Sequence, residues 1–238
     1  PRFTRQVSTL ILRDNEIDVD TARELAKTWE PRVEGEVPEA ASSLGSDPPT
    51  PSSGATAVRE LEALYQASGD EPGVTSIDVS GNTAIGDAGF ELLMAGMAQY
   101  QPFRALQASS IGLHSAGCAA VRLLEPTRIA LLTLSNNDIG SEGAKTVVSA
   151  VKRLPYLLEL DMDNCNIDKS AASAIAEMLR DHDDLRKISL NHNKLGSEGV
   201  IEFCAGAAEA SELKSVHLAS NEISSIEAAK AIADLMTQ

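Results

Sequence analysis

Residues 129–139 read Ile-Ala-Leu-Leu-Thr-Leu-Ser-Asn-Asn-Asp-Ile, and this pattern recurs along the chain. Apolar residues stand at its first, fourth, sixth and eleventh positions, and an asparagine stands at its ninth. The pattern begins again at Leu157, Leu185 and Leu213, so successive copies start 28 residues apart. Weaker copies begin near Val7, Val74 and Phe103, which makes about seven in all. A unit this short cannot bury its own hydrophobic face, so the repetition predicts a solenoid of stacked copies.

Each copy combines two periodicities. Leu132 and Leu134 alternate with variable residues, which predicts a short strand with one face on the core and the other on a concave surface. After a turn, Ala144, Val147 and Val151 recur at helical spacing, and the next copies repeat this spacing. Each repeat is therefore expected to be a strand, a turn and an amphipathic helix.

An asparagine is expected at the turn that leaves most strands. There its amide can satisfy backbone groups that stacking would otherwise bury without a partner. Cys165 takes this place in the fifth copy and Ile111 in the third. The asparagines at this place are Asn15, Asn82, Asn137, Asn193 and Asn221.

These residues resemble leucine-rich repeats. The segments Ile139-Gly-Ser-Glu-Gly143-Ala and Leu195-Gly-Ser-Glu-Gly199-Val are similar to the ribonuclease-inhibitor subtype, which also mixes Asn and Cys at the turn. The resemblance implies an α/β horseshoe with parallel strands on the concave face and α-helices on the convex face. It implies a single domain over residues 1–238. The third copy, which has Ile111 and is 26 residues long, is expected to be distorted, with Arg122 near a position that is apolar elsewhere.

Composition restricts the kind of partner. The formal net charge of −15 disfavours nucleic acid and anionic membrane, both of which are bound through clustered Lys and Arg, and favours a partner with a basic surface. No stretch approaches the roughly 18 apolar residues that span a bilayer. The three cysteines are dispersed, which favours free thiols in a reducing, cytoplasmic setting. No cofactor or metal is expected.

Residues 31–56 form a segment rich in Pro, Ser, Gly and Glu that one repeat does not need. This composition predicts a disordered insertion within the domain. The segment is either a tolerated surface loop or a docking or phosphorylation segment, with Thr50-Pro51 as the proline-directed site. Residues 57–67 are amphipathic and are expected to resume a helix.

Three carboxylates alternate along the fifth strand, at Glu159, Asp161 and Asp163. They should project from the concave face about 7 Å apart. They are a solvated acidic patch, a contact for a basic partner, or a metal or catalytic site, although no cleft or substrate platform supports the last reading. The candidate partner-binding set combines these three with residues of the following strands. That set is Glu159, Asp161, Asp163, Lys187, Asn191 and His217.

His192 and His217 are expected at neighbouring strand positions, without the third ligand that zinc requires.

The function expected from the resemblance is that of a non-enzymatic protein-interaction module or scaffold, for instance in a cytoskeletal or axonemal assembly. A purely structural spacer would have the same sequence features. A regulator of a small GTPase is the alternative, because Ran GTPase-activating proteins share this repeat subtype. The last helix repeats the core-facing pattern at Ala228, Ile232 and Leu235 with no strand after it. We therefore expect that the native chain continues or that this edge meets another chain.

Overall fold

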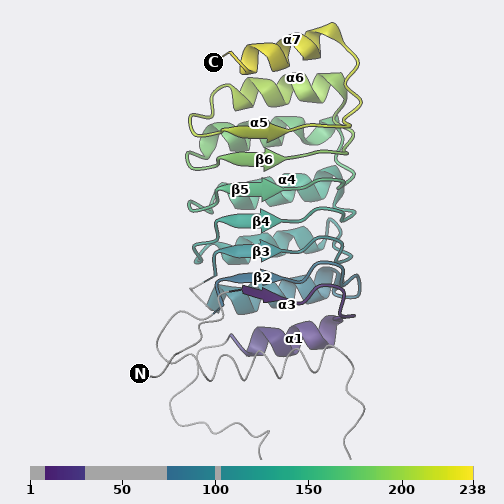
Figure 1. Cartoon of the computed structure of the whole chain (residues 1–238), viewed down its shortest axis with the longest axis vertical. Helices are drawn as coiled ribbons and strands as arrows, with labels where there is room; N and C mark the ends of the chain where they lie inside the picture. Colours follow the sequence, from purple (N-terminus) through teal and green to yellow (C-terminus); the bar gives the residue numbers. More distant parts are fainter. Residues whose placement is uncertain (1–8, 30–73, 100–102, 238) are drawn as a thin grey trace, which may run out of the picture.

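The computed structural model describes residues 9–29, 74–99 and 103–237, which stack as a solenoid (Figure 1). In these residues seven strands form one parallel sheet in sequence order. The strands are β1 (Thr9–Ile11), β2 (Ser76–Asp78), β3 (Ala105–Gln107), β4 (Leu131–Thr133), β5 (Glu159–Asp161), β6 (Lys187–Ser189) and β7 (Ser215–His217). The register is regular, with Leu132 opposite Leu160 and Leu160 opposite Ile188.

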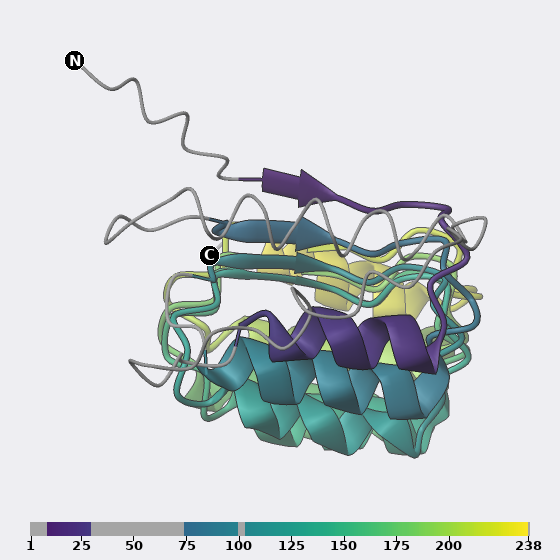
Figure 2. The ribbon, with the colours of Figure 1, turned by 90° about the horizontal axis from the view of Figure 1, so that it is seen from below.

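A layer of helices covers one face of the sheet, and the other face is the concave side (Figure 2). The helices are α1 (Val19–Lys27), α3 (Gly86–Gln99), η2 (Gly117–Leu124), α4 (Gly140–Val151), η3 (Lys169–Ala171), α5 (Ala172–Asp181), α6 (Gly196–Ala207) and α7 (Ile226–Leu235). The α/β horseshoe expected from the sequence is confirmed. None of the helices in the described ranges is long and apolar enough to cross a bilayer.

The core lies between the two layers and is built from the residues that the periodicities predict. Leu132, Leu160 and Ile188 are buried at the centres of their strands. On the helical side Val147 and Val151 are buried as well. The side chains are mostly aliphatic, because each layer of the stack is thin and must be filled from two facing repeats.

The third repeat is distorted, as the sequence predicts. Its convex element η2 is a 3-10 helix of eight residues, whereas the next repeat has the twelve-residue α-helix α4. A 3-10 helix is narrower than an α-helix, and the repeat is also two residues shorter than the 28-residue norm. The expectation of an α-helix in every repeat is therefore wrong here. Arg122 is exposed on this element.

The first helix, α1, has a defined start and end. Asp18 caps α1 by accepting a hydrogen bond from the Thr21 N–H at 2.8 Å, which fixes Val19 as its first residue. Helix α1 ends at Lys27, and Trp29 lies beyond it, buried edge-on against Phe103 at 5.1 Å between ring centroids.

The last repeat covers its apolar residues less well than the others. Val216 on β7 and Ile232 on α7 are only partly buried, whereas the equivalent Ile188 on β6 is fully buried. Ile226 and Met236 expose 71% and 82% of their surface. The predicted insertion at 31–56 and the predicted helix at 57–67 lie outside the described residues.

Candidate protein-binding face

The turn asparagines form a buried ladder that links successive repeats. The Asn193 Oδ1 atom accepts hydrogen bonds from the N–H groups of Cys165 and Ile167, at 3.1 and 3.0 Å. Its Nδ2 atom donates to the carbonyls of Met162 and Leu190, at 2.9 and 3.0 Å. Asn82 and Asn137 repeat this arrangement, which confirms the role predicted for these residues. We call this column the asparagine ladder.

Two members of the predicted column differ from the rest. The Cys165 thiol donates to the carbonyls of Leu134 and Asp163, at 3.3 and 3.4 Å, so it replaces the amide as a donor. Asn15, in the first repeat, is only half-buried, and its side chain donates to the Arg13 carbonyl of its own turn. The full set of four hydrogen bonds is therefore found at Asn82, Asn137 and Asn193, in the second, fourth and sixth repeats.

A second ladder runs beside the first, two residues earlier in each repeat, on the concave side. We call it the outer ladder. Each recorded step joins a side-chain oxygen to the backbone N–H of the next repeat. The four steps are Ser80 Oγ to the N–H of Ser109 (3.1 Å), Ser135 Oγ to Asp163 (3.0 Å), Asp163 Oδ1 to Asn191 (2.6 Å) and Asn191 Oδ1 to Ala219 (2.7 Å).

From the sequence, Asp163 and Asn191 are assigned to the partner-binding set, and no contact between repeats is predicted for the outer-ladder residues. A signal was present in the chain. The residue two places before the asparagine slot is Ser, Ser, Ser, Asp and Asn in the second to sixth repeats, so it carries a side-chain oxygen each time. Only the position of the next repeat shows that this oxygen accepts from a backbone N–H.

The three predicted carboxylates lie together on β5 and its turn, half-buried on the concave face. Glu159 pairs with Lys187, the residue opposite it on β6, at 3.3 Å between Oε2 and Nζ. Asp161 accepts a short hydrogen bond from the Ser135 hydroxyl and a second one from the Asp163 N–H. The Asp163 carboxylate therefore acts within the outer ladder instead of projecting freely into solvent.

Asn191 lies on the concave face but is not exposed. It is half-buried, and its amide nitrogen donates to the Asp163 carboxylate and to the Ser189 hydroxyl, at 3.0 Å in both cases. The Ser189 hydroxyl also donates to Asp163 at 2.7 Å. Ser189 and Asn191 thus hold the Asp163 side chain in one orientation.

The expectation that His192 and His217 stand at neighbouring strand positions is wrong. His217 is exposed on β7, opposite Ser189, and contacts the Ser215 hydroxyl at 3.0 Å. His192 lies in the turn after β6 with a positive φ of 55°, in the same left-handed conformation as Asn164 one repeat earlier. In the part of the chain that the structure describes, no group of three His, Cys, Asp or Glu side chains could hold a metal ion.

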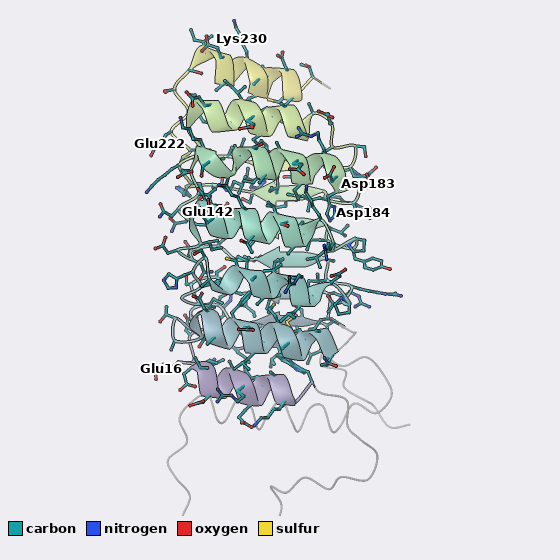
Figure 3. All side chains as sticks on the ribbon, turned by 180° about the vertical axis from the view of Figure 1, so that it is seen from behind. Glu16, Glu142, Asp183, Asp184, Glu222 and Lys230 are labelled. Atoms are coloured by element: carbon teal, nitrogen blue, oxygen red, sulfur yellow. The ribbon has the colours of Figure 1, made fainter. Side chains whose placement is uncertain are left out.

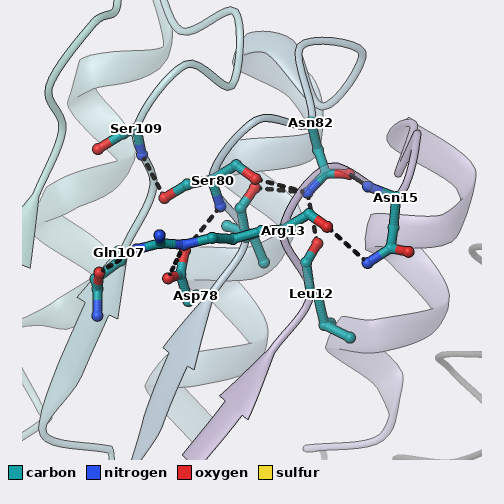
Figure 4. Close-up of polar contacts among 9 residues, drawn as sticks. Leu12, Arg13, Asn15, Asp78, Ser80, Asn82, Gln107 and Ser109 are labelled. Atoms are coloured by element: carbon teal, nitrogen blue, oxygen red, sulfur yellow. Dashed lines mark hydrogen bonds and ion pairs between the residues drawn. The ribbon is translucent and has the colours of Figure 1, made fainter.

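At the N-terminal end of the concave face, Arg13 joins three strands through its side chain (Figure 4). Its guanidinium pairs with Asp78, whose side chain is only 3% exposed, and donates to Gln107 Oε1 at 3.0 Å. The pair is separated by 65 residues in the sequence, so no local pattern could reveal it. The buried Asp78 charge is thereby paired with a cation.

The three cysteines are free and buried. Burial raises the pKa of the Cys118 and Cys165 thiols to about 12, and it raises the pKa of Cys204 as well. Because only the thiolate is strongly nucleophilic, these side chains are poor nucleophiles at neutral pH. They serve packing and, at Cys118 and Cys165, hydrogen bonding to backbone carbonyls.

Comparison with known proteins agrees with this architecture. The family model described as "Leucine Rich repeat" matches residues 74–94, 132–148, 153–176 and 184–204. The ribonuclease inhibitor of Sus scrofa is 32% identical over 152 residues, which are 62% of this chain. The chain is a leucine-rich-repeat protein of the ribonuclease-inhibitor-like type. The sequence resemblance is therefore confirmed, and the likeness supports a protein-interaction module in general.

Another relative shares the repeats within a much larger protein. NACHT, LRR and PYD domains-containing protein 3 of Macaca mulatta is 33% identical over 128 residues, or 52% of this chain. The matched regions are 33% of the length of the Sus scrofa inhibitor and 12% of the length of the macaque protein. The chain thus spans a third or less of these curated relatives.

Proposed function

We propose that the chain is a non-enzymatic binding module whose concave face at β5–β7 docks a basic surface of another protein. The observation that carries this proposal is the state of Asp161 and Asp163. Neither carboxylate takes part in any ion pair recorded among the described residues, and both are held by neutral hydroxyl and amide donors. Two adjacent anions without a cation leave a negative potential that a basic surface can match.

The residues of this face divide by role. Glu159 and Asp161 are the contact residues, since each has one side-chain partner and is half-exposed. Asp163 and Asn191 position that surface through the outer ladder. Lys187 and His217 flank it and limit which basic groups can approach. The ribonuclease-inhibitor likeness supports a protein as the partner.

The test uses charge-removing variants that keep the hydrogen bonds. In Glu159→Gln/Asp161→Asn each side-chain oxygen can still accept, so a loss of binding reports the charge. A fluorescein-labelled peptide of ten lysines is the probe, and Glu91→Gln/Glu227→Gln, which removes two exposed charges from the helical side, is the control. We expect the first variant to slow association about tenfold and the control to change it less than about twofold. Equal association rates for the two variants would contradict the proposal.

Membership of a cytoskeletal or axonemal assembly, a cytoplasmic location and the alternative role in regulating a small GTPase stay predictions. The GTPase role is tested by adding the chain to GTP-loaded small GTPases and following phosphate release. An unchanged rate across the panel would remove it.

The C-terminal edge is a second surface that we propose contacts another chain. Val216, Leu218 and Ile232 are only partly buried there, so the terminal layer presents apolar area that stacking would cover. Sedimentation of the chain over a range of concentrations should show self-association. A constant monomer mass at high concentration would contradict self-association at this edge.

A further inference from the structure

The convex side carries a groove between η2 and α4 that contrasts with the acidic character of the chain. It has a volume of about 390 Å³, and Arg122, Glu142, Lys145, Thr146, Ser149 and Arg153 line it. It lies where the eight-residue 3-10 helix η2 packs beside the twelve-residue α-helix α4. Glu142, labelled in Figure 3, marks the end of this basic groove at the first turn of α4.

Near the start of α4 the two elements approach closely. A Cβ atom on Gly143 would lie 3.0 Å from the Ser115 Cα atom and 3.0 Å from the Cys118 sulfur. Farther along, the groove is lined by Lys145 and Ser149 of α4 and by Arg153, just past the end of that helix. The groove therefore runs along the helix and is not closed over by η2.

The cations of the basic groove have fewer carboxylate partners than the cations between the neighbouring helices. Where α4 meets α5, Lys152 pairs with Glu177 at 2.6 Å and with Asp181 at 3.0 Å. Where η3 meets α6, Lys169 pairs with Glu198 at 2.6 Å. In those places each cation faces a carboxylate of the adjacent repeat.

In the basic groove the arrangement differs. Arg122 takes part in none of the ion pairs recorded among residues 9–29, 74–99 and 103–237. Lys145 pairs with Glu142 of its own helix at 2.7 Å, and Arg153 approaches Glu125 only to 3.9 Å. Three cations thus meet one lining carboxylate and one distant carboxylate, in a chain with a net charge of −15. This local reversal of sign favours an anionic ligand.

The spacing of the cations distinguishes between anions. Lys145 lies on α4 and Arg153 lies two residues past its last residue, Val151, so eight residues at helical rise place their backbones roughly 12 Å apart. To contact both cations, a single phosphate group would need the two long side chains to bend toward each other. An extended segment with several carboxylates can place one near each cation, with the exposed Ser149 hydroxyl between them.

An exposed aromatic residue lies just beyond the groove, in the turn between α4 and β5. Tyr156 exposes 50% of its surface, and the Arg128 guanidinium stands 5.5 Å from its ring centroid. The other aromatic residues in the described ranges are buried: Trp29, Phe90, Phe103 and Phe203. Tyr and Arg are the residues that most often anchor protein interfaces.

We propose that the basic groove, with Arg128 and Tyr156 at its end, binds an acidic segment of a partner protein, rich in Asp and Glu and free of required phosphate. The segment lies along α4, with its carboxylates on Arg122, Lys145 and Arg153 and an apolar residue on Tyr156. This site is separate from the concave face and takes a partner of opposite charge.

A fluorescein-labelled peptide of ten glutamates tests the proposal by fluorescence anisotropy at low salt. Arg122→Glu/Arg153→Glu should weaken binding at least about tenfold, and Tyr156→Ala should leave binding of this purely acidic peptide nearly unchanged, since the peptide has no apolar anchor. With one leucine added at the end of the peptide, Tyr156→Ala should weaken binding. The matched control, Lys214→Glu/Lys230→Glu, makes the same change in net charge on the seventh repeat and should weaken binding less than about twofold.

Three results would overturn the proposal. The first is the absence of binding by the unmodified chain, and the second is an equal loss in the groove variant and the control. The third is displacement of the peptide by inorganic phosphate but not by chloride at matched ionic strength, which would indicate a single-phosphate site. Binding of the ten-lysine peptide should be insensitive to the groove variant, so failure here is distinguishable from failure of the concave-face proposal.

Discussion

The asparagine ladder and the outer ladder run side by side along one edge of the sheet, yet they place the same kind of residue in different surroundings. Asn193 is 3% exposed, and its side-chain oxygen and nitrogen both form hydrogen bonds with buried backbone groups. Asn191, two residues earlier, is half-buried and shares its bonds with Asp163 and Ser189. If the Asn191 side chain is removed, water can replace some of its hydrogen bonds. Water cannot reach the groups that Asn193 contacts, so it cannot replace the hydrogen bonds of Asn193. Burial of the partner groups therefore matters more than the number of hydrogen bonds.

The largest effect is expected for Asn193→Ala. The N–H groups of Cys165 and Ile167 and the carbonyl of Met162 would lose their partner inside the stack. We expect the free energy of unfolding to fall by about 1–3 kcal/mol. Chemical denaturation followed by circular dichroism measures the change, and an unchanged midpoint would show that this ladder is not a main source of stability.

A smaller but measurable loss is expected for Asn191→Ala. The variant removes the acceptor of the Ala219 N–H, which is an exposed contact, and a donor to Asp163 in half-buried surroundings. We expect a fall of about 0.5–1.5 kcal/mol in the free energy of unfolding. The order of the two variants is the test. If Asn191→Ala proved as costly as Asn193→Ala, burial would not be what separates the ladders.

Ser135→Ala examines the outer ladder two repeats before Asn191. The Ser135 hydroxyl donates to Asp161 and accepts from the Asp163 N–H, so its removal should lower the free energy of unfolding by about 1 kcal/mol. Thr133→Ala is the control, since Thr133 is a half-buried concave residue of the same repeat for which no side-chain hydrogen bond is recorded in the described structure. It should change stability by less than about 0.5 kcal/mol. Equal changes would mean that the loss reflects concave burial and not the ladder.

The smallest effect is expected for Cys165→Asn, which would make the fifth repeat like its neighbours. The new amide could accept from the Asn137 N–H and keep the donor to the Leu134 carbonyl, while the Ile139 N–H already donates to the Asn137 carbonyl at 2.9 Å. A gain of less than about 1 kcal/mol is expected, because the thiol already supplies one contact of each kind. A clear loss of stability would show that the turn around Cys165 is shaped for sulfur.

The strong copies of the repeat were sufficient to predict most of the fold. Positions such as Leu132, Val147 and Asn137 could be assigned because each copy repeats the same short-range pattern 28 residues later. Strand, turn and helix follow from spacing within one repeat, and stacking follows from the inability of one repeat to bury its own core. The distortion of the third repeat was predictable for the same reason, since Ile111 and the shorter length break the pattern.

Tertiary structure decided the contacts between repeats. Whether Asp163 and Asn191 face solvent or hold the next turn depends on the position of the adjacent strand, and Arg13 reaches Asp78 across 65 residues. The basic groove likewise depends on the stacking of two repeats, which brings Arg122 and Arg153 together. A repeating sequence determines the period of the stack, because period is a local property. Packing decides which side chains of adjacent repeats come into contact. It therefore also decides which charged residues gather on each of the two candidate binding surfaces.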